Sequence, residues 1–445
     1  MLADPRKAKA FRFVRHEYDN GVARLVYAFD NGPDLIERIA FPDAPPIADT
    51  RRPAFDAALR LLHLIAGVSY FKAGVPARIE IVGDAIDTST ASFMDDVYRH
   101  GLAEFAYHNK LDLRERIRFP STEKSAAKAP SIGLPRRTLV PIGGGKDSLV
   151  TVEALKRIGE PATAVWVGDS ALIAACAQRT ELPLLSIKRQ LASELFEYNK
   201  LGAYNGHIPV TAINSAILVC AAVLYGFDAI AFSNERSASV ATLEYDGQEI
   251  NHQWSKGIAF ERDLRAYIER EVAADLDYFS LLRPLSELAV TRAFARVARY
   301  DDVFSSCNRN FRIRGERPSD RWCGQCPKCH FVFLALAPFV AKPRLLGIFG
   351  RNLLDDIALA PGFDALLEYR DHKPFECVGE GRESRAAMFA LSQRPEWRED
   401  ALVARFADEI LPQLDRGELA LDPLLTPDGE NFVPTRLAGI VDEAG

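Results

Sequence analysis

The chain has 445 residues, of which 48% are hydrophobic and 26% are charged, and its formal net charge is −6. This length exceeds what one hydrophobic core organises, and the composition excludes wholesale disorder, so we expect two or three globular domains. The negative charge gives no electrostatic footprint for nucleic acid or anionic membranes, and the N-terminus lacks the apolar stretch of a secretory signal. The sequence therefore predicts a cytoplasmic protein with no nucleic-acid or membrane partner, and it leaves the oligomeric state open.

The first part of the chain, residues 1–120, alternates strand-like and helical stretches, which predicts an N-terminal α+β domain. The segment 121–137 is rich in Pro, Ser, Ala and Lys, and this composition is typical of an exposed linker. The expected elements of the N-terminal domain are strands 23–29 and 79–82 and helices 55–67 and 91–107.

After the linker, short apolar strands alternate with amphipathic helices, a rhythm that predicts a doubly wound parallel sheet over residues 138–300. Ligands of such α/β folds bind beyond the carboxyl ends of the strands. Residues 301–345 form a cysteine-rich segment, and 346–445 are expected to be a mixed or helical region. The expected elements of the sheet are strands 139–142, 162–167, 184–187 and 228–232 and helices 148–158, 171–180 and 211–225.

A glycine loop joins the first of these strands to its helix: Gly143, Gly144 and Gly145 are followed by Lys146, Asp147 and Ser148. Backbone N–H groups of such a loop and the helix N-terminus can surround a phosphate. The spacing differs from a Walker A loop. A simple glycine turn is the alternative interpretation.

The loop resembles the S-G-G-x-D-S loop of the PP-loop ATP pyrophosphatases, except that Gly143 replaces the usual serine. By this resemblance Lys146 neutralises phosphate charge, Ser148 donates to a phosphate, and Asp147 helps to hold Mg²⁺, so that ATP is split to AMP and pyrophosphate. Glu235 also lies at a predicted strand end, where a ligand-binding role and an ordinary polar loop are equally good interpretations.

Four cysteines predict a metal site, namely Cys323, Cys326 and Cys329 at two-residue spacings and Cys307 further upstream. Four thiolates form a closed tetrahedral site for structural Zn²⁺. The pattern is similar to the zinc site of the PP-loop enzyme 7-cyano-7-deazaguanine synthase. His330 in place of one cysteine, an iron–sulfur cluster and unmetallated buried thiols are the alternatives.

Longer stretches resemble the MurL family of bacterial peptidoglycan synthesis, and the resemblance runs nearly end to end. It implies a small-molecule substrate that carries UDP, a muramoyl sugar and a dipeptide ending in L-glutamate, which is epimerised to D-glutamate at the expense of ATP. Among the stretches that carry this resemblance are IGGGKDSLV (142–150), NGHIPVTAINSAILV (205–219), RWCGQCPKCHFVFLALAPF (321–339) and DHKPFECVGEGRES (371–384).

Epimerisation through an adenylylated carboxylate needs groups that remove and return the α-proton. Segments that combine titratable side chains with turn residues supply five candidates: Cys377, His372, Glu380, His252 and Lys256. For these a solvated loop is the plain alternative. Arginines suited to bind diphosphate or carboxylate groups are Arg236, Arg283, Arg309 and Arg351, with surface ion pairing as their alternative.

Two other functions stay open from the residues alone. The first is an ATP-dependent ligase that forms an amide or nitrile on an adenylylated carboxylate, and it would require ammonia or an amine. The second is a non-catalytic nucleotide-binding module with a structural zinc, and it would bind ATP without releasing AMP.

Overall fold

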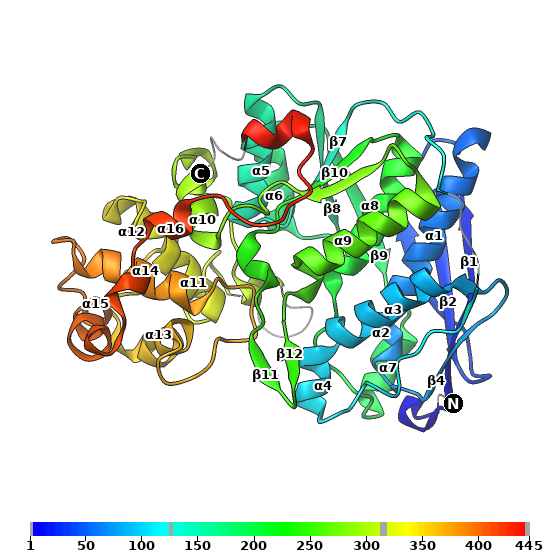
Figure 1. The fold of residues 1–445 in the computed structure, drawn as a ribbon, viewed down its shortest axis with the longest axis horizontal. Coiled ribbons are helices and arrows are strands. Elements are labelled where there is room, and N and C mark those ends of the chain that lie inside the picture. The colour runs from blue at the N-terminus through cyan, green and yellow to red at the C-terminus, as the bar shows by residue number, and fades with distance from the viewer. Residues whose placement is uncertain (1–2, 124–127, 312–317, 441–445) are drawn as a thin grey trace.

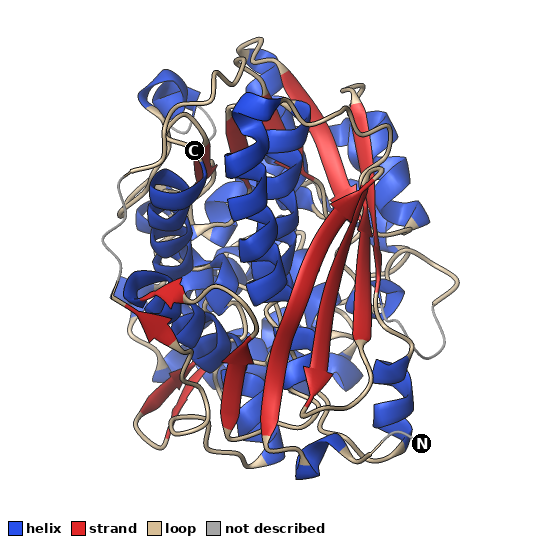
Figure 2. Cartoon of the chain, turned by 90° about the vertical axis from the view of Figure 1, so that its right-hand side faces the viewer, coloured by secondary structure: helices blue, strands red, loops and turns tan. Residues whose placement is uncertain are grey.

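The computed structural model describes residues 3–123, 128–311 and 318–440, so part of the expected linker lies outside the described residues. One nine-stranded sheet runs from the middle of the molecule to its right-hand edge in Figure 1, and Figure 2 shows it from that side. In spatial order its strands are β13 (Asp277–Ser280), β10 (Ala229–Phe232), β7 (Thr138–Pro141), β8 (Ala162–Val167), β9 (Leu184–Gln190), β3 (Leu35–Ala40), β2 (Val22–Phe29), β1 (Ala10–Asp19) and β4 (Arg78–Ile81).

The half of the sheet from β13 to β9 is parallel. Its central strands β7, β8 and β10 are mostly apolar, as expected where helices cover both faces of a sheet. Neighbouring residues of β7 point to opposite sides: Leu139 joins one hydrophobic core and Val140 joins the other. This mostly parallel sheet confirms the expected α/β class. One face carries α1 (Arg52–Ala66), α8 (Val210–Tyr225) and α9 (Ile258–Tyr267), and the other carries α5 (Lys146–Arg157), α6 (Ala171–Arg179) and α10 (Glu287–Ala295).

The N-terminal strands continue the same sheet. β3 pairs antiparallel with β9, with Arg38 opposite Gln190. Next to this pairing, Arg189 Nε lies 2.7 Å from Oε1 of the fully buried Glu37. Residues on both sides of the linker thus share a sheet and a core, and the division into domains stays a prediction.

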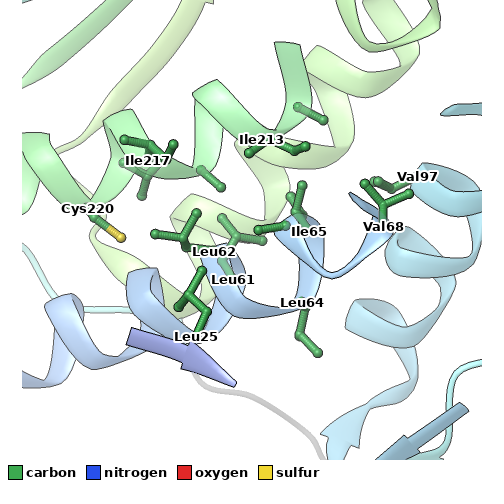
Figure 3. Close-up of a cluster of buried hydrophobic side chains, with 14 of the residues drawn as sticks. Leu25, Leu61, Leu62, Leu64, Ile65, Val68, Val97, Ile213, Ile217 and Cys220 are labelled. Carbon is green, nitrogen blue, oxygen red and sulfur yellow. The ribbon is translucent and has the colours of Figure 1, made fainter. Parts of the chain in front are cut away.

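Helices α1 and α8 hold this shared core together (Figure 3). Leu62 and Ile65 of α1 lie beside Ile213 and Ile217 of α8, and all four are buried. Truncation of such a leucine to alanine costs about 2–5 kcal/mol. The stretch Asp49–Phe71 has the length and apolarity of a membrane span, but 83% of its apolar window is buried inside the protein.

Element boundaries agree closely with expectation in the parallel half, where β8 spans 162–167 as predicted. The expected helix 91–107 is two helices, α3 (Thr88–Gly101) and α4 (Ala103–Asn109), because the backbone of Leu102 leaves helical geometry between them. Strands β1, β3 and β13 and the β11–β12 hairpin were not predicted. The remaining N-terminal and central elements are α2 (Val68–Phe71), β5 (Ile86–Asp87), β6 (Ser121–Thr122), α7 (Glu194–Lys200), β11 (Leu243–Tyr245) and β12 (Gln248–Ile250).

The C-terminal part is helical over its described residues and lies beside the parallel half of the sheet (Figure 1). Its first helix packs against α10, so this region closes over one end of the sheet. Its helices are α11 (Pro327–Leu336), α12 (Lys342–Phe349), α13 (Ala360–Leu367), α14 (Gly381–Ser392), α15 (Ala401–Arg405) and α16 (Asp422–Leu425).

Candidate active site

A cleft of about 300 Å³ lies beyond the carboxyl ends of β7, β8 and β10. Its wall includes Gly143, Gly145 and Ser148 of the glycine loop. A Cβ atom on Gly145 would lie 2.6 Å from Ser306 Oγ, so a larger residue there would force the Ser306 hydroxyl to turn away. No described side chain caps the N-terminus of α5, so its free N–H groups face the position where an anion would bind.

Two charged residues of the loop, Lys146 and Asp147, lie close to the carboxylates of Glu235 and Glu287. Lys146 is buried, contacts Asp147, and lies 2.9 Å from Glu287 Oε1. Burial lowers the pKa of Lys146, but Asp147 and Glu287 outweigh burial and raise it above its ordinary value. Lys146 therefore neutralises carboxylates of the protein in this structure, while the lysines that line the described part of the cleft are Lys256 and Lys328.

The carboxylates of Asp147, Glu235 and Glu287 fit a Mg²⁺ site. One oxygen of each lies within 4.8 Å of the others. Glu287 Oε2 is buried and has no hydrogen-bond partner among the described residues. Burial together with Asp147 and Glu235 raises the pKa of Glu287 to about 7, against the opposing effect of Lys146. A hard divalent cation would relieve this crowding of like charges.

Glu287 was missed from the sequence. It begins α10 directly after Ser286, whose hydroxyl accepts the N–H of Ala289 at 3.0 Å. That pattern is typical of an ordinary helix start, where an acidic residue is stabilised by the helix dipole. Only the packing of α10 against α5 brings this carboxylate to the glycine loop.

A second cluster assembles three of the predicted acid–base candidates, Cys377, His252 and Lys256. Cys377 is partly exposed and lines the cleft with Lys256. His252 and Lys256 are the two cations that, with Lys328, act on its thiol. Burial raises the pKa of the thiol, but Lys256, His252 and Lys328 together lower it to about 5, so Cys377 is a thiolate at neutral pH.

The other two candidates lie elsewhere. His372 is exposed, and its Nδ1 lies 3.0 Å from a carboxylate oxygen of its neighbour Asp371. Glu380 caps α14 in a capping box with Glu383, whose Oε2 accepts the Glu380 N–H at 2.8 Å. The structure thus gives Glu380 a local structural role and brings neither residue to the cleft wall.

The four arginines predicted to bind substrate do not gather at one place. Arg283 is buried, pairs with Glu261 at 2.8 Å, and donates to the backbone oxygens of Glu235 and Lys256 at 2.8 and 2.5 Å. It therefore holds two site segments together. Arg236 donates to Pro284 O at 3.4 Å, Arg351 donates to Gly324 O at 2.8 Å, and Arg309 is exposed.

The four predicted metal cysteines converge, as expected. All four sulfurs lie within 4.8 Å of one another, with 3.7 Å between Cys323 and Cys329 and 3.4 Å between Cys326 and Cys329. A tetrahedral Zn²⁺ with Zn–S bonds of about 2.3 Å places its sulfurs about 3.8 Å apart, so the set fits zinc. His330 turns away: its ring stacks on Phe363 at 4.9 Å.

Known proteins match this chain over nearly its whole length. The family model of the MurL N-terminal domain matches residues 2–281, and that of the MurL C-terminal domain matches residues 303–420. A protein of Xanthomonas oryzae pv. oryzae named UDP-N-acetyl-alpha-D-muramoyl-L-alanyl-L-glutamate epimerase is 60% identical over 98% of this chain and 97% of its own length. Proteins of the same name from Salinispora tropica and a Micromonospora species are 44% and 41% identical, over 97% and 96% of this chain and 95% and 97% of their own lengths. The chain therefore belongs to the MurL family.

Proposed function

We propose that this chain is an ATP-dependent epimerase that converts the terminal L-glutamate of UDP-N-acetylmuramoyl-L-alanyl-L-glutamate to D-glutamate. The substrate and the stereochemical change come from the name shared by the three relatives. The coupling to ATP cleavage and the PP-loop nature of the nucleotide site rest on the glycine loop and its surroundings. The cytoplasmic location stays a prediction.

One observation carries the mechanism: Cys377 lines the same cleft as Gly143, Gly145 and Ser148. A carboxylate activated on the glycine loop would therefore lie beside a thiolate. Neither the glycine loop nor the Cys377 thiolate explains epimerisation alone, because a phosphate site cannot remove an α-proton and a thiolate cannot activate a carboxylate.

The carboxylate must be activated before the α-proton is removed. An α-hydrogen beside a carboxylate is barely acidic, because its removal would place a second negative charge next to the first. The glutamate carboxylate attacks the α-phosphorus of ATP, and pyrophosphate leaves. The resulting acyl adenylate is uncharged at the carbonyl, so its α-proton is far more acidic.

The Cys377 thiolate then takes the α-proton. The Cα–H bond breaks, an S–H bond forms, and the electron pair moves to the carbonyl oxygen, where a nearby cation such as the Lys256 ammonium can stabilise it. A proton returns to the opposite face of Cα, and water hydrolyses the mixed anhydride to release AMP. Two consecutive half-reactions thus share one bound substrate.

The proposal includes two metal sites. Asp147, Glu235 and Glu287 would hold Mg²⁺, which neutralises triphosphate charge when bound. Cys307, Cys323, Cys326 and Cys329 would hold a structural Zn²⁺ with no open coordination position.

The test incubates the protein with the UDP-muramoyl dipeptide, ATP and Mg²⁺ in deuterated water, and assays glutamate chirality, α-deuterium, AMP and pyrophosphate. We expect D-glutamate only with ATP and alongside AMP. Solvent deuterium at Cα from the first turnover would indicate two proton-transfer groups, whereas retained substrate hydrogen would indicate one. AMP without inversion favours a ligase, and no AMP favours a binding module.

Asp147→Ala provides the matching variant. We expect it to abolish AMP formation and epimerisation together, because loss of one preorganised charged group from the phosphate site slows activation about 100- to 1,000-fold. Asp19→Ala, an exposed change in β1, is the control and should retain both activities. Inversion without AMP release by Asp147→Ala would contradict the coupling.

A further inference from the structure

Glu104, a buried carboxylate in the first turn of α4, lies among three histidines. Its Oε2 lies 2.5 Å from His252 Nδ1 and 3.8 Å from His207 Nδ1. Its Oε1 lies 3.9 Å from Nε2 of His108, which is one turn further along α4 and about half exposed. Glu104 was not predicted from the sequence as a site residue.

His252 connects this carboxylate to the cleft, because it contacts Glu104 and is one of the charged groups that act on the Cys377 thiol. The order thiol, imidazole, carboxylate is the arrangement in which one group activates a thiol and a third group orients the second. The three residues come from distant parts of the chain: α4, the segment after β12, and the segment before α14. Their meeting therefore depends on the packing of the N-terminal and C-terminal regions against the sheet.

We propose that Glu104 is a positioning residue that holds His252 as an imidazolium against Cys377 and so keeps the thiolate ready to take the substrate's α-proton. This proposal rests on the proposed function for its consequence in turnover. The pairing of Glu104, His252 and Cys377 can be measured without substrate.

The charges around His252 support this role. Burial lowers the pKa of His252, but its bonds to Cys377 and Glu104 raise it to about 10. His207, whose ring centroid lies 4.3 Å from that of His252, has its pKa lowered to about 4 by burial and by His252, so it stays neutral. One imidazolium therefore lies between two anions, and removal of either anion weakens its hold on the proton.

The remaining charged groups act on the thiol itself. Lys256 and Lys328 face Cys377 from the segment before α9 and from α11. Burial raises the pKa of the neighbouring Glu376 to about 7, with an opposing effect of His252 and a further rise from Cys377. Glu104 therefore acts on Cys377 through His252, whereas these groups act directly.

The experiment measures alkylation of Cys377 by iodoacetamide from about pH 4 to about pH 9, quantified on the peptide that carries Cys377. In the unsubstituted protein the rate should rise through a midpoint at about 5. Glu104→Gln, which keeps shape and hydrogen bonding, should raise the midpoint by about one pH unit or more. Glu104→Asp should restore part of the shift, and Asp95→Asn, a partly buried carboxylate of α3 that is not in contact with the cluster, should change nothing.

In turnover, Glu104→Gln should lower kcat for epimerisation about 10- to 100-fold with little change in KM, since proton transfer slows and binding does not. An unchanged Cys377 midpoint in folded Glu104→Gln overturns the proposal. So does a divalent metal present in the unsubstituted protein and lost from Glu104→Gln, because Glu104, His207 and His252 would then be ligands. A shifted midpoint in a protein that does not epimerise would refute the proposed function and leave the pairing intact.

Discussion

Two groups of thiols adjoin the start of α11, and they differ in their neighbours. The first includes Cys326 and Cys329, and the second is Cys377 alone, which contacts Lys328 of α11. Cys307, Cys323, Cys326 and Cys329 gather sulfur around sulfur. Cys377 is a single thiol surrounded by Lys256, His252 and Lys328. The first arrangement suits a metal that stabilises the fold, and the second suits a thiolate that moves a proton. The neighbours of a thiol therefore determine its chemistry.

The largest effect on activity is expected from Cys377→Ser, because a serine hydroxyl has a far higher pKa than this thiol. We expect epimerisation to fall about 100- to 10,000-fold, the usual contribution of a proton-transfer group. Zinc content and thermal unfolding should match the unsubstituted protein. AMP release assayed on the same samples should persist, because activation of the carboxylate precedes proton removal.

The reciprocal variant is Cys326→Ser, which removes one of four converging sulfurs. We expect loss of the bound metal and a decrease of more than about 3 kcal/mol in the free energy of unfolding, because metal binding is coupled to folding. Metal analysis and denaturant unfolding measure the two effects. Full metal content in this variant would contradict the assignment of Cys326 as a ligand.

These two groups also differ in how far the sequence predicts them. Three of the four metal cysteines are neighbours in the chain, so their spacing alone indicates a metal site. Cys377, His252 and Lys256 were each predicted as candidates from their local segments, but their contact depends on how the C-terminal region packs over the sheet. His372 and Glu380 carry the same local signals, and the structure places them at the surface and at a helix cap.

Buried carboxylates were the hardest features to predict. Glu104 and Glu287 each lie in the first turn of a helix, where acidic residues are common for reasons of helix stability. Their sequence pattern is that of a solvated position, and only tertiary packing buries them. Four strands of the parallel half were predictable for the opposite reason, since β7, β8, β10 and the start of β9 are apolar and alternate with helices. Polar residues at both ends of β13 and charged residues along β1 hid those two strands.

The smallest expected effect concerns Lys328, which links the two groups. It lies between the predicted ligands Cys326 and Cys329 in sequence, yet its Nζ donates to the backbone oxygen of Cys377. Lys256 acts on the Cys377 thiol more strongly and lines the same cleft.

We therefore expect Lys328→Met to raise the midpoint of Cys377 alkylation by about half a pH unit, and Lys256→Met to raise it by about one unit or more. Arg351→Met, which removes a donor to Gly324 O beside the metal cysteines, is the control and should leave the midpoint unchanged. A larger shift for Lys328→Met than for Lys256→Met would contradict this ranking. Loss of metal from Lys328→Met would show that the two groups are one coupled unit, since a charge change at the thiolate would then disturb the metal site.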